Sequence, residues 1–389
     1  MNPGNHYSQL NSAKLISGGH EYFDLLKKLI SSAQNTLHIQ TYIFSDDYTG
    51  TMIAEQLIIA AKRNVSVFII ADGVASKSLN HNFISSLENA GVHFRFFEPL
   101  FKNKKYYLGR RLHHKIITAD NRYALVGGIN IADRYNDMPK EKAWLDYAIL
   151  VEGEIVSQIN DYCRSVWDGF SFTDFPEKET VYNFADLIPL NNRCEIRMRR
   201  NDWMWHKNEI SSSYIEMLHQ SKKEVIILCS YFIPGKVIRR ILSHTAKRGV
   251  KIKVITAGPS DVWIVKKAER WLYDWLLRNK IELYEYQNNV LHGKLAVCDK
   301  EWITIGSYNI NNLSTYASIE FNLDVKNNIL AESVYGTMEN VIKQDCLPVT
   351  KETHKKSKNP FKQLTRWISY QLIRAALKMF TFYFKQKHQ

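Results

Sequence analysis

The sequence predicts an α/β protein of two pseudo-symmetric lobes, each a mixed, mainly parallel sheet flanked by helices, followed by a C-terminal amphipathic helix. Three observations support this fold class. Helical and strand-like segments alternate along both halves of the chain. A short segment around His113 recurs 179 residues later around His292. Basic residues concentrate after residue 350.

The order of elements is the same in both halves. In the first half, helical periodicity covers residues 21–33, 53–62 and 82–89, and strand-like runs cover 36–44, 65–73 and 92–98. In the second half, helices are expected at 213–220, 236–247 and 262–278, and strands at 224–232, 250–258 and 281–286. The repeat is too long for a solenoid, so it indicates a duplicated lobe.

Domain limits follow from this order. We expect an N-terminal lobe at residues 1–180, with its motif at about 108–135, and a C-terminal lobe at 190–345, with its motif at about 287–314. Periodicity lapses at 175–192, where the junction is expected. Residues 351–389 form a separate basic tail.

Composition is that of a globular protein, with 389 residues, of which 45% are hydrophobic and 23% charged. The five cysteines are scattered and never form a CxxC pair, which argues against a zinc site or a disulfide framework and favours a reducing compartment. The N-terminal residues lack a signal-peptide core, and no uncharged apolar run reaches the roughly 18 residues of a spanning helix. We therefore expect no segment that crosses a membrane.

Positive charge is concentrated in the tail. Of the net charge of +13, the tail carries +9, from ten Lys or Arg against one acid, Glu352. Its basic residues recur at helical spacing among Trp, Phe, Leu and Ile, which is typical of a helix lying in the headgroup plane of an anionic membrane. The alternative is a helix packed on the lobes with its lysines in water.

The repeated motif keeps six positions in register. From each histidine, Lys follows at +2, Asp at +7, Gly at +14, Asn at +17 and Ile at +18. One copy is weak evidence, but two copies with the same trailing residues are a strong signal. The motif residues are His113, Lys115, Asp120, Gly127 and Asn130 in the first half, and His292, Lys294, Asp299, Gly306 and Asn309 in the second.

These residue types predict chemistry on an anion. On a strand, His113 and Lys115 share a face, whereas Asp120 at an odd offset faces away and suits a structural role, as does His114. Lysines and amides would hold the oxygens of a phosphodiester, and histidine would act as nucleophile or acid. Displacement at phosphorus is in line, so attack and protonation of the leaving group need two histidines, one from each lobe.

A histidine needs a partner that fixes its tautomer. We assign Asp146, in "WLDYAILV", and Glu320, in "SIEFNLDV", as the orienting carboxylates. For Asp146, an ordinary surface acid on a strand is the alternative, because the loop lengths before the two residues differ.

At this point a resemblance appears. "RLHHKIITAD", "VGGINIADRY" and "WLD" in the first half, and "SYFIPGKVI", "LHGKLAVCD" and "GSYNI" in the second, resemble the duplicated His-x-Lys-x-x-x-x-Asp signature of the phospholipase D superfamily. The resemblance covers roughly residues 20–345 and is greatest to bacterial cardiolipin synthases. Ser230 and Arg134 depart from the family pattern, and the paired N-terminal membrane helices of some members are absent.

The resemblance implies a ping-pong reaction through a phosphohistidine, without metal or cofactor, in which His113 is the nucleophile. Its catalytic residues would be His113, Lys115, Asp120, His292, Lys294 and Asp299. Its phosphate-binding residues would be Asn130, Asn309, Gly128 and Ser307.

The function expected from these observations is transfer of a phosphatidyl group from one phosphatidylglycerol to a second, releasing glycerol. Water or phosphatidylethanolamine as acceptor stays open, as does the oligomeric state. A nuclease or phospholipase D-type hydrolase is the alternative, and a non-catalytic membrane scaffold is a further rival that the intact motifs disfavour. We expect anionic phospholipid and the membrane surface as partners, no nucleic acid, and peripheral attachment to the cytoplasmic side of the cell membrane through the tail.

Overall fold

The computed structural model describes residues 6–98, 101–102, 105–106, 110–169, 182–202, 205, 207–311, 318–356 and 359–386, with the side chains from 376 onward outside the description. Part of the predicted junction, residues 175–181, therefore lies outside the described residues. The chain forms two compact units. Unit 1 comprises residues 1–199, 305–307 and 319–327, and unit 2 comprises 200–304, 308–318 and 328–389.

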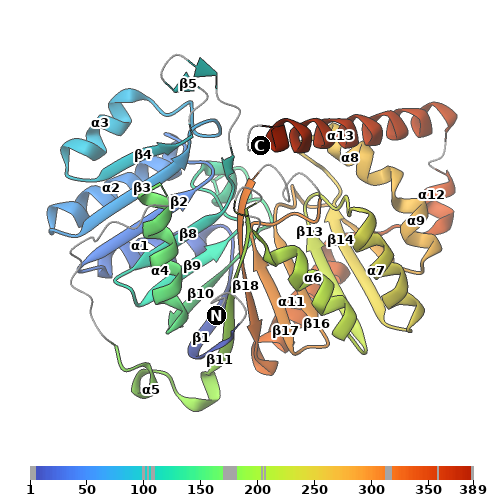
Figure 1. The fold of residues 1–389 in the computed structure, drawn as a ribbon, viewed down its shortest axis with the longest axis horizontal. Helices are drawn as coiled ribbons and strands as arrows, with labels where there is room; N and C mark the ends of the chain where they lie inside the picture. The colour runs from blue at the N-terminus through green and yellow to red at the C-terminus, as the bar shows by residue number, and fades with distance from the viewer. Residues whose placement is uncertain are drawn as a thin grey trace. The chain divides into compact units, whose positions relative to one another are not determined.

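Unit 1 contains a mixed sheet with helices on both faces (Figure 1). The strands of this sheet are β1 (Ser8–Ser17), β2 (Thr36–Thr41), β3 (Ser66–Asp72), β4 (His93–Phe97), β7 (Arg111–Leu112), β8 (Lys115–Ala119), β9 (Tyr123–Gly127), β10 (Tyr147–Gly153), most of β11 (Cys194–Asp202) and of β18 (Ser318–Lys326). A separate two-stranded sheet consists of β5 (Phe101–Lys102) and β6 (Lys105–Tyr106). The helices of unit 1 are α1 (His20–Ser32), α2 (Tyr48–Lys62), α3 (His81–Asn89), α4 (Ile155–Trp167) and α5 (Phe184–Leu187), with short 3-10 turns η2 (Asp133–Tyr135) and η3 (Leu190–Asn192).

Unit 2 repeats this plan. Its strands are β12 (Lys207–Asn208), β13 (Glu224–Cys229), β14 (Lys251–Ala257), β15 (Glu282–Tyr286), β16 (Lys294–Cys298), most of β17 (Trp302–Gly306), and β19 (Cys346–Pro348). Its helices are α6 (Glu209–Gln220), α7 (Lys236–Lys247), α8 (Trp263–Trp271), α9 (Tyr273–Arg278), α11 (Asn328–Asp345), α12 (Lys351–Lys356) and α13 (Pro360–Gln386). The single helix expected at 262–278 is broken at Leu272, whose N–H bonds to the carbonyl of Glu269 three residues back.

Among the described residues, parallel ladders join β2–β3–β4 in unit 1 and β13–β14–β15 in unit 2. The motif strand β8 pairs antiparallel with β2 and β9, and β16 pairs antiparallel with β13. The sheets are therefore mixed, as expected, but the expectation that they are mainly parallel is corrected. The motif strand β8 returns to its neighbour β9 through a tight turn, not through a helical crossover, and tight turns join antiparallel strands.

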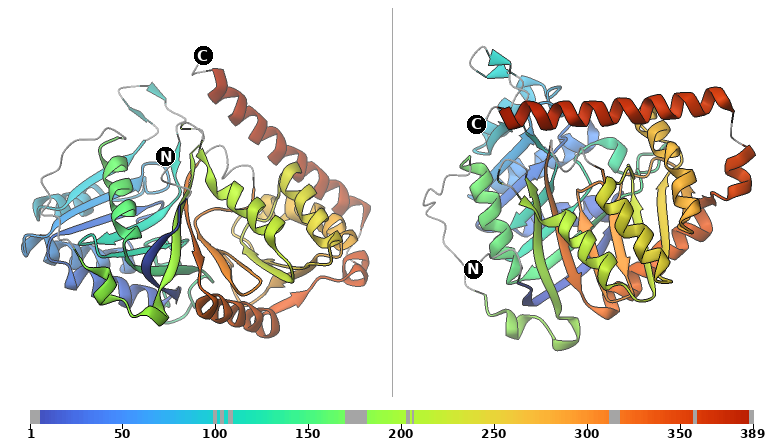
Figure 2. Two further views of the ribbon diagram at one scale, coloured as in Figure 1. Left: turned by 60° about the horizontal axis from the view of Figure 1, so that its bottom comes forward. Right: turned by 45° about the vertical axis from the view of Figure 1, so that its right-hand side comes forward.

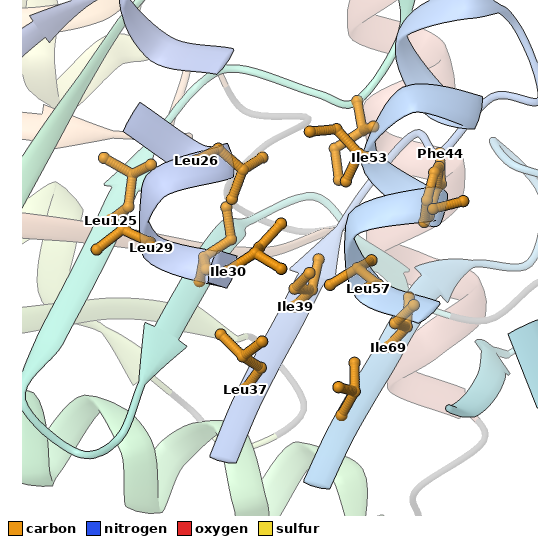
Figure 3. Close-up of a cluster of buried hydrophobic side chains, with 14 of the residues drawn as sticks. Leu26, Leu29, Ile30, Leu37, Ile39, Phe44, Ile53, Leu57, Ile69 and Leu125 are labelled. Carbon is orange, nitrogen blue, oxygen red and sulfur yellow. The ribbon is translucent and has the colours of Figure 1, made fainter. Parts of the chain in front are cut away.

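The core of unit 1 follows from alternation along β2. Leu37 and Ile39 point to one face, where they pack with Leu26 of α1 and Leu57 of α2 (Figure 3). Gln40 points to the opposite face and donates to the carbonyl of Cys163 in α4. The sheet is therefore covered on both sides, which is why β2 is buried along its whole length.

Two structural details occur in both units and confirm the duplication. Asp120 accepts the backbone N–H groups of residues 34, 35 and 36 at 2.7–2.9 Å, and Asp299 accepts those of residues 222, 223 and 224 at 2.7–2.9 Å. Arg63 donates to the carbonyls at the end of α1, and Arg248 donates to those at the end of α6. These four residues fix the turns from helix to strand.

The tail forms the 27-residue helix α13, which lies beside α8 in every view (Figures 1 and 2). Tyr370 is buried with Ala268 and Leu272 in a small apolar cluster. The first half of α13 thus packs on unit 2 and leaves its other face open. Within the described residues, every helix is too short or too polar to span a bilayer.

Candidate active site

In unit 1, the first histidine lies in the break between β7 and β8. The Asp72 carboxylate, which is fully buried, accepts from the backbone N–H of Leu112 at 2.8 Å and from Arg111 at 3.2 Å. The backbone N–H groups of His113 and His114 both donate to the carbonyl of Ile319 at 3.1 Å. This anchoring holds the His113 ring in place even though the strand is interrupted there.

A buried carboxylate orients this ring. Glu320 Oε2 lies 2.9 Å from His113 Nδ1, and the Glu320 side chain is completely buried. The Ser307 hydroxyl also donates to Glu320 Oε2, and the Phe321 N–H donates to Ser307 Oγ. With Nδ1–H donated to Glu320, the lone pair of the ring stays on Nε2. The side chain of His113 is 16% exposed, so Nε2 can be reached from outside.

The pairing crosses the repeats. Glu320 follows His292 in sequence, yet it packs in unit 1 and contacts the histidine of the first half. Sequence spacing left open which histidine each carboxylate serves. Ser307, which the resemblance groups with the phosphate-binding residues, directs its hydroxyl hydrogen at Glu320, so here it positions the carboxylate.

Asp146 occupies the corresponding place in the first repeat. It is 1% exposed, and its Oδ1 accepts from the Tyr147 N–H at 2.7 Å. Gly128 lies against it, since a Cβ at position 128 would be 2.4 Å from Asp146 Oδ1. Gly128 stands where Ser307 stands in the second repeat, and the absence of a side chain leaves room for the carboxylate.

The motif amides are held by their oxygen atoms. Asn130 Oδ1 accepts from the Ile43 N–H at 3.0 Å, and Asn309 Oδ1 accepts from Ser230 Oγ at 2.7 Å. The Asn130 Nδ2 group is buried and has no hydrogen-bond partner among the described residues. A buried donor without a partner is costly, which indicates that an acceptor from outside the chain completes it.

The motif lysines fold back in the same way in both units. The ammonium of Lys115 donates to the carbonyl of His113, and that of Lys294 donates to the carbonyl of His292. Lys294 Nζ also lies 3.1 Å from His292 Nδ1. Both lysines are almost fully buried, so each places a positive charge beside its histidine in a medium that screens it weakly.

The motif aspartates lie elsewhere. The carboxylates of Asp120 and Asp299 are occupied by the backbone N–H groups of the helix-to-strand turns, and both residues have positive φ, 52° and 51°. We therefore give Asp120 and Asp299 a structural role. The resemblance had implied that both are catalytic, but their carboxylates are directed at the turns and not at a substrate. Their odd offset from the histidine on the strand already indicated this.

His114 is a core residue, as its odd offset predicts. Its Nε2 lies 2.7 Å from Gln40 Oε1, and the side chain is fully buried. Burial lowers the pKa of His114 to about 3, with the charges of Lys115 and His113 adding to the effect. The ring is therefore neutral at pH 7 and takes no part in proton transfer.

Sequence reasoning missed Tyr42. Its ring lies edge-on to His113 with centroids 4.8 Å apart, and the Lys115 ammonium lies 5.1 Å from the ring centroid. Burial, followed by the charge of Asp72, raises the pKa of Tyr42, so it stays protonated. The sequence repeat could have revealed this residue, because Tyr42 and Tyr231 occupy matching positions in "TYIF" and "SYFI".

The arrangement supplies a nucleophile, cations and amide donors. Within the described residues, His, Cys, Asp and Glu side chains form no group of three that could hold a metal ion. Cys229 is buried, which raises its pKa to about 11, so its thiol is inert at neutral pH.

Known proteins resemble this chain over most of its length. Cardiolipin synthase B of Salmonella typhi is 32% identical over 341 residues, covering 87% of this chain and 82% of that protein. Cardiolipin synthase B of Escherichia coli K12 is 30% identical over 348 residues, with the same coverage. The crystal structure of phosphatidylserine synthase from Haemophilus influenzae Rd KW20 has a TM-score of 0.72 at 14% identity, covers 97% of both chains, and shows the same fold.

The profile of the family described as "Cardiolipin synthase, PLD-like domain" matches residues 26–167 and 214–343. The two matched ranges contain the two histidine motifs and most of the residues that orient them. This chain belongs to the cardiolipin synthase, phospholipase D-like family.

Proposed function

We propose that this protein transfers a phosphatidyl group from one phosphatidylglycerol to a second, forming cardiolipin and glycerol. The observation that carries the proposal is the contact of His113 Nδ1 with the buried Glu320, which leaves Nε2 as a nucleophile. Family membership and the names of the relatives support the same activity and point to phospholipid substrates.

The proposed reaction has two displacements at one phosphorus. His113 Nε2 donates its lone pair to phosphorus, and the bond to the glycerol headgroup oxygen breaks. The leaving oxygen takes a proton from His292, and Glu320 stabilises the positive charge on the ring of His113. His292 then removes the proton from a hydroxyl of the second lipid, whose oxygen attacks phosphorus as the bond to nitrogen breaks. Lys115, Lys294 and the two motif asparagines hold the non-bridging oxygens.

A substrate with an acidic leaving group tests the two roles separately. Phosphatidyl-p-nitrophenol needs no proton donor for its first step, because p-nitrophenolate departs unaided. We expect His292→Ala to release about one equivalent of p-nitrophenol and to retain phosphohistidine, whereas His113→Ala releases none. With phosphatidylglycerol, both variants should lose turnover by 100-fold or more, as expected for lost general acid or nucleophile.

Other outcomes of this test contradict the proposal. A burst from His113→Ala would exclude this histidine as the nucleophile. Formation of phosphatidic acid without cardiolipin by the unaltered protein would assign water as the acceptor and a hydrolase function. Plasmid DNA serves as the parallel substrate for the nuclease alternative.

We further propose that α13 attaches the protein to the cytoplasmic side of the membrane. Its outer face carries five exposed apolar side chains, while Arg366, Ser369 and Tyr370 are buried beneath. The exposed residues are Phe361, Leu364, Trp367, Ile368 and Leu372. Aromatic and aliphatic side chains on a basic helix suit the headgroup boundary of an anionic bilayer.

Substitution of the exposed face tests this attachment. Phe361→Ser, Leu364→Ser and Ile368→Ser together should weaken sedimentation with phosphatidylglycerol vesicles by 100-fold or more, since each removes about 1.5 kcal/mol or more of apolar transfer free energy. Exposed Ile329→Ser on α11 is the control and should change binding little. Unchanged sedimentation of the triple variant would refute attachment through α13.

A further inference from the structure

A basic groove lies on unit 2, and its lining includes none of the histidine-motif residues. It has a volume of about 410 Å³ and runs along α7, with Trp275 of α9 at its side. A volume of this size lies within the range of small-ligand sites. Five of its lining side chains carry or can carry positive charge, namely Lys236, Arg239, Arg240, His244 and Lys247. We call this feature the α7 groove.

The cations of the α7 groove differ in their partners from Lys253 and Arg270 of the same unit. Lys253 is paired with Glu224 and Glu339, and Arg270 is paired with Glu285. Among the described residues, no ion pair joins any of the five groove cations to a carboxylate. The charge of the groove is therefore not neutralised by the protein itself.

The first repeat provides an internal comparison. α2 and α7 end in the matching sequences "AAKR" and "TAKR", and both pack on the parallel strands of their unit. The positions that carry Lys236, Arg239, Arg240 and His244 in α7 carry Thr51, Ala54, Glu55 and Ile59 in α2. Lys247 has a counterpart in Lys62, but the other four groove positions are neutral or acidic in α2. These four basic side chains are therefore a property of the second repeat and not a requirement of its packing.

One groove residue lacks an acceptor. The Nε atom of Arg239 is buried and has no hydrogen-bond partner among the described residues. Its guanidinium lies 5.9 Å from the Trp275 ring centroid, which holds the planar group in position. A buried N–H without an acceptor, beside four further cations, indicates a missing anion.

The spacing of the cations suits phosphate. Lys236, Arg240 and His244 follow each other at four-residue intervals, so they form one row of about 12 Å along the helix. Arg239 lies in the neighbouring row, so two guanidinium groups face one strip of the groove and can hold phosphate oxygens in pairs. Val237, which is 62% exposed on the same helix, offers apolar surface beside the charges.

We propose that the α7 groove binds the headgroup phosphate of an anionic phospholipid at a second site, separate from the one where lipid is converted; this rests on the proposed function. The same chemistry would accept a free phosphate, so the two sources need separate arms in the test. The lipid is favoured because the proposed substrate is an anionic phospholipid and because the exposed Val237 lies on the same helix as the groove cations.

The test compares two variants of equal charge change in the full chain. The groove variant is Lys236→Gln, Arg239→Gln and Arg240→Gln. The control variant is Lys222→Gln, Lys223→Gln and Lys343→Gln, three exposed lysines of the same unit. Both are made in the His113→Ala background, so that no lipid is consumed and binding is read even if the proposed function fails.

Sedimentation is measured with phosphatidylcholine vesicles with and without phosphatidylglycerol. Each basic residue near an anionic surface contributes about 1 kcal/mol to binding, so the partition coefficient of the groove variant for the anionic vesicles should fall roughly 100-fold. The partition coefficient of the control variant should fall less than about threefold. Thermal protection by soluble glycerophosphoglycerol should likewise be smaller in the groove variant than in the control, the remainder coming from the motif lysines and asparagines. Equal partition of the groove variant and its parent would overturn the proposal. Protection by inorganic phosphate alone, with vesicle binding unchanged, would also overturn it and assign the groove to free phosphate.

Discussion

The contact between His113 and Glu320 leads to a sharp prediction for Glu320→Gln. The substitution keeps the shape of the side chain but removes the charge from a fully buried group that accepts from His113 Nδ1 at 2.9 Å. A hydrogen bond to a charged group contributes about 1.5–3 kcal/mol, which alone is a factor of roughly 10–150 in rate. The amide also has a donor end, which favours the wrong histidine tautomer and, in catalytic triads, costs about 10⁴ in kcat.

We therefore expect Glu320→Gln to lower kcat by 10²–10⁴, measured from cardiolipin formed in phosphatidylglycerol vesicles and from the p-nitrophenol burst. Asp324→Asn is the matched control, since Asp324 is equally buried on the same strand but pairs with Arg197 at 2.9 Å. It should lower stability, by about 3–5 kcal/mol for a broken buried pair, and leave kcat per folded molecule within about threefold. A kcat for Glu320→Gln within a few fold of the parent would refute the orienting role.

Three further outcomes follow from the geometry. Asp120→Asn and Asp299→Asn should each lower the free energy of unfolding in urea by about 1.5–3 kcal/mol, by weakening three charge-assisted hydrogen bonds, with kcat per folded molecule unchanged. Gly128→Ala should lower kcat at least tenfold, because its Cβ would displace the Asp146 carboxylate; a normal kcat would remove Asp146 from the site. His114 binds a proton at about pH 3 when folded but near its ordinary pKa of 6.5 when unfolded. Between these values the unfolded state binds more protons, so stability should fall by about 1.4 kcal/mol per unit as pH drops from 6.5, and His114→Gln should flatten this slope in urea titrations.

The sequence predicted the elements that depend on local periodicity. The expected helix at 236–247 is α7 to the residue, and the expected strands at 224–232 and 250–258 contain β13 and β14. These segments are apolar runs or amphipathic helices, so their pattern alone determines their type. The histidine, lysine and asparagine of each motif were found because the repeat supplied a second copy in the same register.

Other features depend on tertiary contacts that leave no local pattern. β1 is a mostly polar strand, and it forms because β10 and β11 pair with it on either side. Just before the break of the motif strand, the N–H of Leu112 donates to Asp72, which lies 40 positions earlier in the sequence. No local sequence pattern records this contact. The hydrogen bond from Ser307 to Glu320 was unpredictable for the same reason, since it depends on where β18 packs.

The origin of Glu320 in the second repeat has a consequence for synthesis. Residue 320 is added to the growing chain 207 positions after residue 113. At usual translation speeds of about 5–20 residues per second, roughly 10–40 s separate the two events. During that interval a nascent polypeptide holds a histidine that has no acid to activate it. If Glu320 activates His113 as proposed, chains that stop before residue 320 should lack the activating acid.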